Sequence, residues 1–331
     1  MATTLDDEVC AYLVSVIVHD LGLAARIPEM RAKPGPFFAS DSPEKLRLKG
    51  VEFWAVLERL VAAKRDAVTY FSCLAALHKS RLKYARILRS QPIPTMDQVG
   101  PRGLLQYGSM SPQALTGLLL WRKWLYDIDN RAAQETGYLF EPIIAHSIGG
   151  APFSSSQSPI RRHDDRGKRR QVDCVRDKRA YEFKMRVTIA ASGQGRWREE
   201  MDFPLDCRKS GFKPVLLVFD GTRNPKLTEL TKAFLKCGGE THVGDHAWQH
   251  LEDEAGDVMA RFLDIYVRGP IQALLKEVPG DVLPELRLKM NKHRLVVAVG
   301  GESMQVKRAS RRSVDTEDPM PVDVGDESPG V

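Results

Sequence analysis

Apolar side chains recur at spacings of three and four through most of the first 130 residues, a pattern that predicts amphipathic helices. The pattern covers three stretches, residues 6–27, 43–88 and 111–148. Proline and glycine interrupt it at 33–43 and 89–103, as they do where helices end. We therefore expect residues 1–130 to form a largely helical N-terminal region.

Beyond residue 150 the pattern changes to short alternating runs. Residues 149–159 have the composition of a loop. Residues 160–190 then suggest three short strands joined by the turns "DDRGK" and "RDKR". The segment "ASGQG" resembles a flexible link into a short helix at 196–203.

Two further elements complete the pattern of an α/β fold. The compact apolar run at 213–222 is typical of a buried strand, and residues 245–267 form an amphipathic helix with one apolar face. We assign 131–303 to an α/β core with C-terminal helices, and 304–331 to an acidic tail that we expect to be disordered.

Charge is unevenly distributed over the 331 residues. The net charge is +6, but residues 313–331 hold six acids and neither lysine nor arginine. Without residues 313–331 the rest of the chain has a net charge of about +12, which favours a polyanionic partner such as nucleic acid. A solvated basic surface remains the plain alternative.

The five cysteines are scattered and form no C-x-x-C pair, which argues against a disulfide framework. The N-terminus is acidic, unlike a signal peptide, and no apolar run approaches the roughly 20 residues that span a bilayer. We expect a cytoplasmic protein without a membrane segment.

The stretch "AYEFKMRV" places an acid and a lysine on an otherwise apolar strand. Because side chains alternate along a strand, Glu182 and Lys184 share one face while Tyr181 and Phe183 share the other. If the preceding strand pairs through "RDKR", Asp173 converges with Glu182, and Lys184 stands about 7 Å further along.

Two close carboxylates repel each other unless a cation lies between them. Mg²⁺ suits such a place, because it takes one or two protein carboxylates and fills its other positions with water and phosphate oxygens. The sequence thus predicts a metal site at Asp173 and Glu182 for phosphodiester chemistry, with Lys184 acting on water or phosphate. An exposed salt-bridging E-x-K face is the alternative.

The order of helix, strand hairpin, helix and strand around D…E-x-K resembles the PD-(D/E)xK nuclease superfamily. Asp173 matches its first acid, Glu182 its second and Lys184 its lysine, although Val172 stands where the proline is usual. Glu141 matches the helix glutamate seen in many members, with Glu135 on the same predicted helix.

Phrases such as "ETGYLFEPIIAHSIGG", "PVLLVFDGT" and "DHAWQHLEDEAG" give a narrower resemblance, to the ApaLI-like type II restriction endonucleases, over roughly residues 110–270. This resemblance implies a Mg²⁺-dependent homodimer that cuts double-stranded DNA at a short palindrome, GTGCAC for the enzyme that gives the family its name. A repair or recombination nuclease and a non-catalytic DNA-binding protein are the alternatives.

Basic side chains gather next to the predicted site. Residues 161–170 hold six lysines and arginines, which we interpret as a hairpin that contacts DNA phosphates, although a solvated turn has the same composition. The candidate DNA contacts are Arg161, Arg162, Lys168, Arg169, Arg170, Gln194 and Arg196.

Two other groups of side chains fit a metal less well. His242, His246 and His250 are spaced by four, with Cys237 upstream, but no second cysteine completes a zinc motif. Glu199 and Glu200 are interpreted as surface carboxylates.

Overall fold

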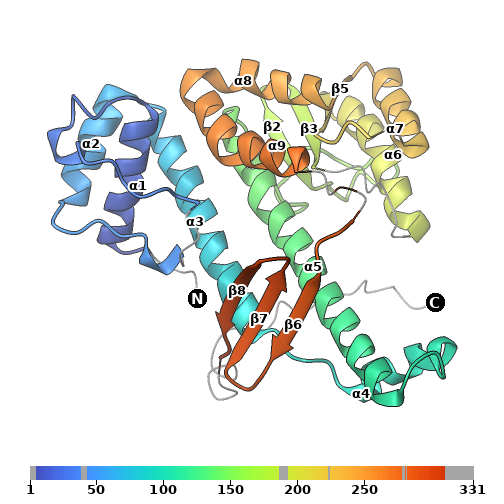
Figure 1. Ribbon diagram of the computed structural model, residues 1–331. Helices are drawn as coiled ribbons and strands as arrows, with labels where there is room; N and C mark the ends of the chain where they lie inside the picture. Colours follow the sequence, from blue (N-terminus) through green and yellow to red (C-terminus); the bar gives the residue numbers. More distant parts are fainter. Residues whose placement is uncertain are drawn as a thin grey trace. The chain divides into compact units, whose positions relative to one another are not determined.

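The computed structural model describes residues 5–38, 43–185, 193–222, 224–277, 280 and 282–309 (Figure 1). Their contacts form two compact units. The larger unit joins residues 5–80 to residues 134–278, and the smaller unit joins residues 81–133 to the described residues after 279.

A five-stranded mixed sheet is the centre of the larger unit. Its strands lie in chain order: β1 (Ala151–Phe153), β2 (Val172–Arg176), β3 (Arg179–Lys184), β4 (Lys213–Val218) and β5 (Glu240–Val243). β1, β2 and β3 are antiparallel, whereas β3, β4 and β5 are parallel. Parallel neighbours need crossover connections, and α6 (Gly193–Lys209) and α7 (Pro225–Lys236) provide them. The predicted mixed sheet with flanking helices is confirmed.

Side chains alternate between two apolar cores on the two faces of this sheet. On β3, Tyr181 and Phe183 join the larger core, while Ala180 joins the smaller one. Phe203 of α6 and Phe234 of α7 complete the smaller core, and these two helices pack side by side (Figure 1). The face of β3 that carries Glu182 and Lys184 is therefore the face covered by α6.

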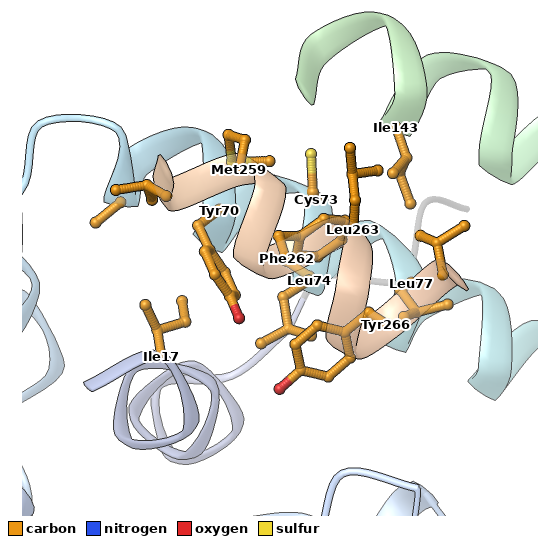
Figure 2. Close-up of a cluster of buried hydrophobic side chains, with 14 of the residues drawn as sticks. Ile17, Tyr70, Cys73, Leu74, Leu77, Ile143, Met259, Phe262, Leu263 and Tyr266 are labelled. Carbon is orange, nitrogen blue, oxygen red and sulfur yellow. The ribbon is translucent and has the colours of Figure 1, made fainter. Parts of the chain in front are cut away.

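Helices from both ends of the larger unit fill the other core. They include α1 (Asp7–Asp20), α2 (Phe53–Ala63), α3 (Ala67–Ser90), the end of α5 (Pro112–Ser147) and α8 (Asp245–Leu263), which continues through a π-helical turn (Asp264–Arg268) into α9 (Gly269–Lys276). Short 3-10 turns lie at Pro28–Met30 and Pro43–Lys45. Figure 2 shows Ile17, Tyr70 and Leu74 packed against Phe262 and Tyr266.

A half-buried carboxylate connects the same helices. Asp20 accepts hydrogen bonds from the hydroxyls of Tyr70 (2.8 Å) and Tyr266 (2.7 Å). Residues 5–80 thus share one core with the sheet, which differs from the expected division at residue 130, because the apolar faces of the early helices are buried against α8.

The smaller unit contains a second sheet that the sequence did not predict. β6 (Leu286–Met290), β7 (Arg294–Val299) and β8 (Glu302–Lys307) are antiparallel neighbours in that order. The unit also includes α4 (Met96–Val99), a 3-10 helix (Gly100–Gln106) and the first part of α5. The predicted tail boundary at 304 falls inside β8, and residues 310–331 lie outside the described residues.

Three local predictions around the sheet are corrected. The expected loop at 149–159 contains β1, which pairs with β2. The expected strand from residue 160 is instead a turn closed by one bridge between Arg161 and Arg169. The helix expected at 196–203 belongs to the longer α6.

No helix in the described parts of the chain combines the length and the apolar character that crossing a bilayer requires.

Candidate active site

Asp173 and Glu182 lie on neighbouring antiparallel strands. The β2–β3 register pairs Cys174 with Tyr181, and one further step along both strands brings Asp173 opposite Glu182. The backbone N–H of Phe183 donates to Oδ2 of Asp173 at 2.8 Å, which fixes this carboxylate against β3. The convergence predicted from the "RDKR" turn is confirmed.

Lys184 lies between two carboxylates. Its Nζ atom donates to Oε1 of Glu182 at 2.7 Å, and it lies 3.3 Å from Oε1 of Glu200 on α6. All three side chains are about four-fifths buried, with exposed fractions of 21%, 18% and 18% for Lys184, Glu182 and Glu200. Low exposure strengthens these interactions relative to a surface ion pair.

Glu141 on α5 contributes a third carboxylate. Burial raises its pKa, and the charge of Glu182 raises it further, while Lys184 opposes the rise. The charge of Glu141 also raises the pKa of Asp173. Of the two glutamates that the sequence places on this helix, Glu135 and Glu141, it is therefore Glu141 that interacts electrostatically with Asp173 and Glu182.

The electrostatics of this group favour a cation. Burial, Glu182 and Glu141 together hold the pKa of Asp173 well above its ordinary value. Carboxylates with raised pKa values take a proton or a positive ion in order to remain close. The oxygen-rich donor set fits Mg²⁺, so Asp173 and Glu182 are suitable ligands.

The charge state of Lys184 follows from the same carboxylates. Burial alone would lower its pKa, but Glu182 and Glu200 outweigh burial and raise the pKa above the ordinary lysine value. The ammonium group is therefore protonated at neutral pH in the protein without metal.

One pocket brings the acids together with the basic turn. Its wall includes the acidic and lysine side chains of the β-strands, two glutamates of α6 and three arginines: Asp173, Glu182, Lys184, Glu199, Glu200, Arg162, Arg169 and Arg170. A phosphate group that enters this pocket meets positive side chains beside the carboxylate pair.

A half-exposed ion pair and a buried one attach the basic turn to α6. Both Oε atoms of Glu199 accept from the guanidinium of Arg162, at 2.6 and 3.0 Å. Asp206, fully buried, accepts from Nε of Arg170 and from the backbone N–H of His163. These contacts fix the turn beside the pocket.

The predicted DNA contacts therefore fall into three groups. Arg161, Lys168 and Arg169 are exposed. Arg162 and Arg170 are committed to carboxylates of α6, and Arg170 is only 7% exposed, so Arg170 is a poor candidate for a phosphate contact. Gln194 and Arg196 lie in the first turn of α6, but their side chains lie outside the described part of the chain.

The interpretation of Glu199 and Glu200 as surface carboxylates is wrong for Glu200, whose side chain is only 18% exposed, whereas the side chain of Glu199 is 47% exposed. Helical periodicity places Glu200 on the face of Trp197, Phe203 and Cys207, and these residues pack on the sheet. The pattern could therefore have directed Glu200 inward. The sequence analysis also missed Asp206 of the same helix, which is buried and pairs with Arg170.

Comparisons with known proteins identify the family of the chain. The profile of the ApaLI-like restriction endonuclease family matches residues 41–268. The type II restriction enzyme ApaLI of Acetobacter pasteurianus is 47% identical over 274 residues, which cover 78% of this chain and 73% of that enzyme. No solved structure matches the chain. With more than half of its length inside the family profile, the chain belongs to the ApaLI-like restriction endonuclease family.

Proposed function

We propose that this restriction endonuclease hydrolyses phosphodiester bonds of double-stranded DNA at a short palindrome, using Mg²⁺ held by Asp173 and Glu182. The observation that supports this most is the single pocket that combines these carboxylates with Lys184 and with arginines of the 161–170 turn. The D…E-x-K arrangement on a mixed sheet supports assignment to the PD-(D/E)xK superfamily.

When bound, Mg²⁺ polarises a phosphate oxygen and makes a water molecule more acidic. Asp173 and Glu182 would hold the ion, and Mg²⁺ needs no more than two protein carboxylates. Glu141 adds negative charge next to them, which disfavours any occupant that is not a cation.

Lys184 is suited to charge stabilisation. Because Glu182 and Glu200 keep its pKa high, its ammonium group is a donor rather than a base in the protein without metal. It can therefore donate a hydrogen bond to a phosphate oxygen or to the attacking water, and offset the charge that develops during cleavage.

The exposed cations of the basic turn suit DNA binding. Arg162 and Arg170 form ion pairs with carboxylates of α6. Lys168 instead lies 3.4 Å from Asp165 within the turn itself, and Arg161 and Arg169 are exposed beside it. Contacts from such residues to phosphates carry no sequence information and serve to position the duplex. Base reading then belongs to other residues of the chain.

The resemblance to the ApaLI enzyme makes GTGCAC the first palindrome to test and a homodimer the expected assembly. We also place the protein in the cytoplasm, where its DNA substrate would be found.

The test is cleavage of a plasmid with GTGCAC sites, with and without Mg²⁺. We expect discrete fragments only with Mg²⁺, and loss of cutting in Asp173→Asn and Glu182→Gln with DNA binding retained. Asp177→Asn is the matched control, because Asp177 lies on the β2–β3 turn and its side chain is 89% exposed.

The other outcomes identify the alternatives. A smear would indicate a non-specific nuclease of the repair or recombination type. A gel shift without cutting would indicate a DNA-binding protein. Normal cutting by Asp173→Asn would contradict the assigned site.

A further inference from the structure

Two histidines and a glutamate come together beside β5, at one edge of the five-stranded sheet. Strand β4 separates β5 from β3, the strand that carries Lys184. One ligand-type atom from each of Glu240, His242 and His250 lies within 4.8 Å of the other two. Among the described residues, this is the one group of three metal-ligand side chains that comes so close. None of the three lines the pocket of the acid pair.

Local structure brings the three side chains together. Glu240 and His242 are two residues apart on β5, so they share a face. Gly244, at φ 61°, turns the chain from β5 directly into α8. Most residues other than glycine avoid this conformation, and it brings the second turn of α8, with His250, back to the strand.

Each imidazole has one buried nitrogen without a hydrogen-bond partner among the described residues. The rings of His242 and His250 stack with centroids 4.3 Å apart at 27°. The Nε2 atom of each ring is buried and makes no hydrogen bond. Nearly all buried polar atoms in proteins have a partner, so two orphaned nitrogens on stacked rings indicate a missing partner.

Glu240 has one oxygen available in the same place. Oε1 accepts from Lys213, whereas Oε2 lies 3.6 Å from Nε2 of His242, a separation too long for a hydrogen bond. The carboxylate can therefore keep its lysine partner and offer Oε2 to an ion.

We propose that Glu240, His242 and His250 form a second metal site, which takes Zn²⁺ or a similar transition-metal ion. Two imidazoles and one carboxylate are a donor set that zinc uses in proteins, whereas Mg²⁺ prefers oxygen donors alone. Zinc–ligand distances of about 2.0–2.2 Å require only that the three atoms draw together by a small movement.

Water can fill the fourth position. The hollow at this site is also lined by His246, Gln249 and Asp253, so it is open and polar. An ion here would tie the edge strand β5 to α8, and it would act on stability rather than on DNA cleavage. The proposal does not depend on the Mg²⁺ site.

The test is a Co²⁺ titration of the full-length Asp173→Asn protein, which lacks one ligand of the Mg²⁺ site. We expect visible absorption bands that saturate at one equivalent and disappear when Zn²⁺ is added, with excess Mg²⁺ having no effect. Zn²⁺ should also raise the melting temperature. The bands should be lost in His242→Ala and in His250→Gln, with folding checked by circular dichroism.

His246→Ala is the matched control, because His246 lies one turn before His250 on α8 and lines the same hollow, yet contributes nothing to the trio. It should keep the bands. The proposal is overturned if the parent protein gives no bands and no Zn²⁺-dependent stabilisation, or if a folded His242→Ala protein binds Co²⁺ normally. Equal loss in His246→Ala would overturn the assigned ligands.

Discussion

Oε1 of Glu200 lies 3.3 Å from Nζ of Lys184, so α6 supplies the lysine with a second carboxylate besides Glu182 of its own strand. Glu200 also has a buried oxygen, Oε2, without a hydrogen-bond partner. The proposed nuclease site thus includes a helix residue whose one oxygen lies next to the lysine while the other is buried and unpaired among the described residues.

Replacing Glu200 with glutamine should slow cleavage. The substitution keeps the shape but removes the charge that holds Lys184 in place, and outer partners of such sites typically contribute roughly 10- to 100-fold to activity. Single-turnover cleavage at saturating DNA measures the change. Asp202→Asn is the control on the same helix, because Asp202 forms an ion pair with the exposed Arg198, and an unchanged rate in Glu200→Gln would contradict the role.

The core of the site could be predicted from the sequence because it is local. Asp173, Glu182 and Lys184 lie within twelve consecutive residues, where strand alternation and one tight turn decide which side chains meet. The parallel strand β4 was also predicted, since its run of apolar residues is buried on both faces.

Other parts depend on contacts that no local pattern contains. Asp20 bonds Tyr266 across 246 positions, so the pairing of the first helix with α8 could not be predicted. The strands β6 and β8 are largely exposed, and without a buried face they lack a strong alternating signal. Arg170 looked like a DNA contact because its partner, Asp206, is 36 residues away.

The contribution of Asp173 and Glu141 to the stability of the protein without metal should fall as pH rises above about 4. Asp173 and Glu141 have raised pKa values in the folded protein, so between their ordinary and raised pKa values the folded state binds more protons than the unfolded state. Their contribution to the unfolding free energy then decreases with pH across that window. Urea unfolding in EDTA measures this.

Two comparisons identify which groups cause the change of unfolding free energy with pH. Asp173→Asn removes one of these titrating groups, so its stability should rise more, or fall less, from pH 4 to pH 7 than that of the wild type. Added Mg²⁺ should restore stability at neutral pH, because the ion replaces the proton between the carboxylates. A wild-type protein whose stability in EDTA rises from pH 4 to pH 7 as much as that of Asp173→Asn would contradict the interpretation.

Neutralising the exposed cations of the basic turn should reduce the salt dependence of DNA binding. Each lost phosphate contact lowers the slope of log K against log salt by about 0.9. The variant is Arg161→Gln, Lys168→Gln and Arg169→Gln together, measured in Ca²⁺ to prevent cutting. Lys226→Gln, on α7, is a control for net charge, and equal slopes in the triple variant and the wild type would show that the turn faces solvent.

Removing Asp206 should destabilise the protein without touching the acid pair. Asp206 is fully buried and pairs with Arg170, whose side chain is 8% exposed, so its loss leaves a buried guanidinium with reduced compensation. Breaking a buried pair in this way costs about 3–5 kcal/mol. Thermal or urea unfolding of Asp206→Ala measures the loss, and Asp164→Ala, an exposed acid of the same turn, should change stability by less than about 0.5 kcal/mol.

Cleavage of both strands should require two copies of the chain. The D…E-x-K set occurs once in the proposed site, whereas a duplex has two antiparallel strands. A two-fold dimer presents two equivalent sites to two strands related by the same symmetry, which is why palindromic sites match dimer symmetry. The active species is therefore expected to be a homodimer on DNA.

Mixed dimers provide the measurement. Wild-type subunits combined with Lys184→Ala subunits should yield nicked plasmid, because one strand of each site faces an intact lysine and the other does not. Mass measurements in solution, with and without DNA, give the assembly directly. Wild type mixed with Asp177→Asn subunits should give only linear product. A protein that remains monomeric on DNA, and whose mixtures with Lys184→Ala give no nicked product, would rule out the two-site arrangement.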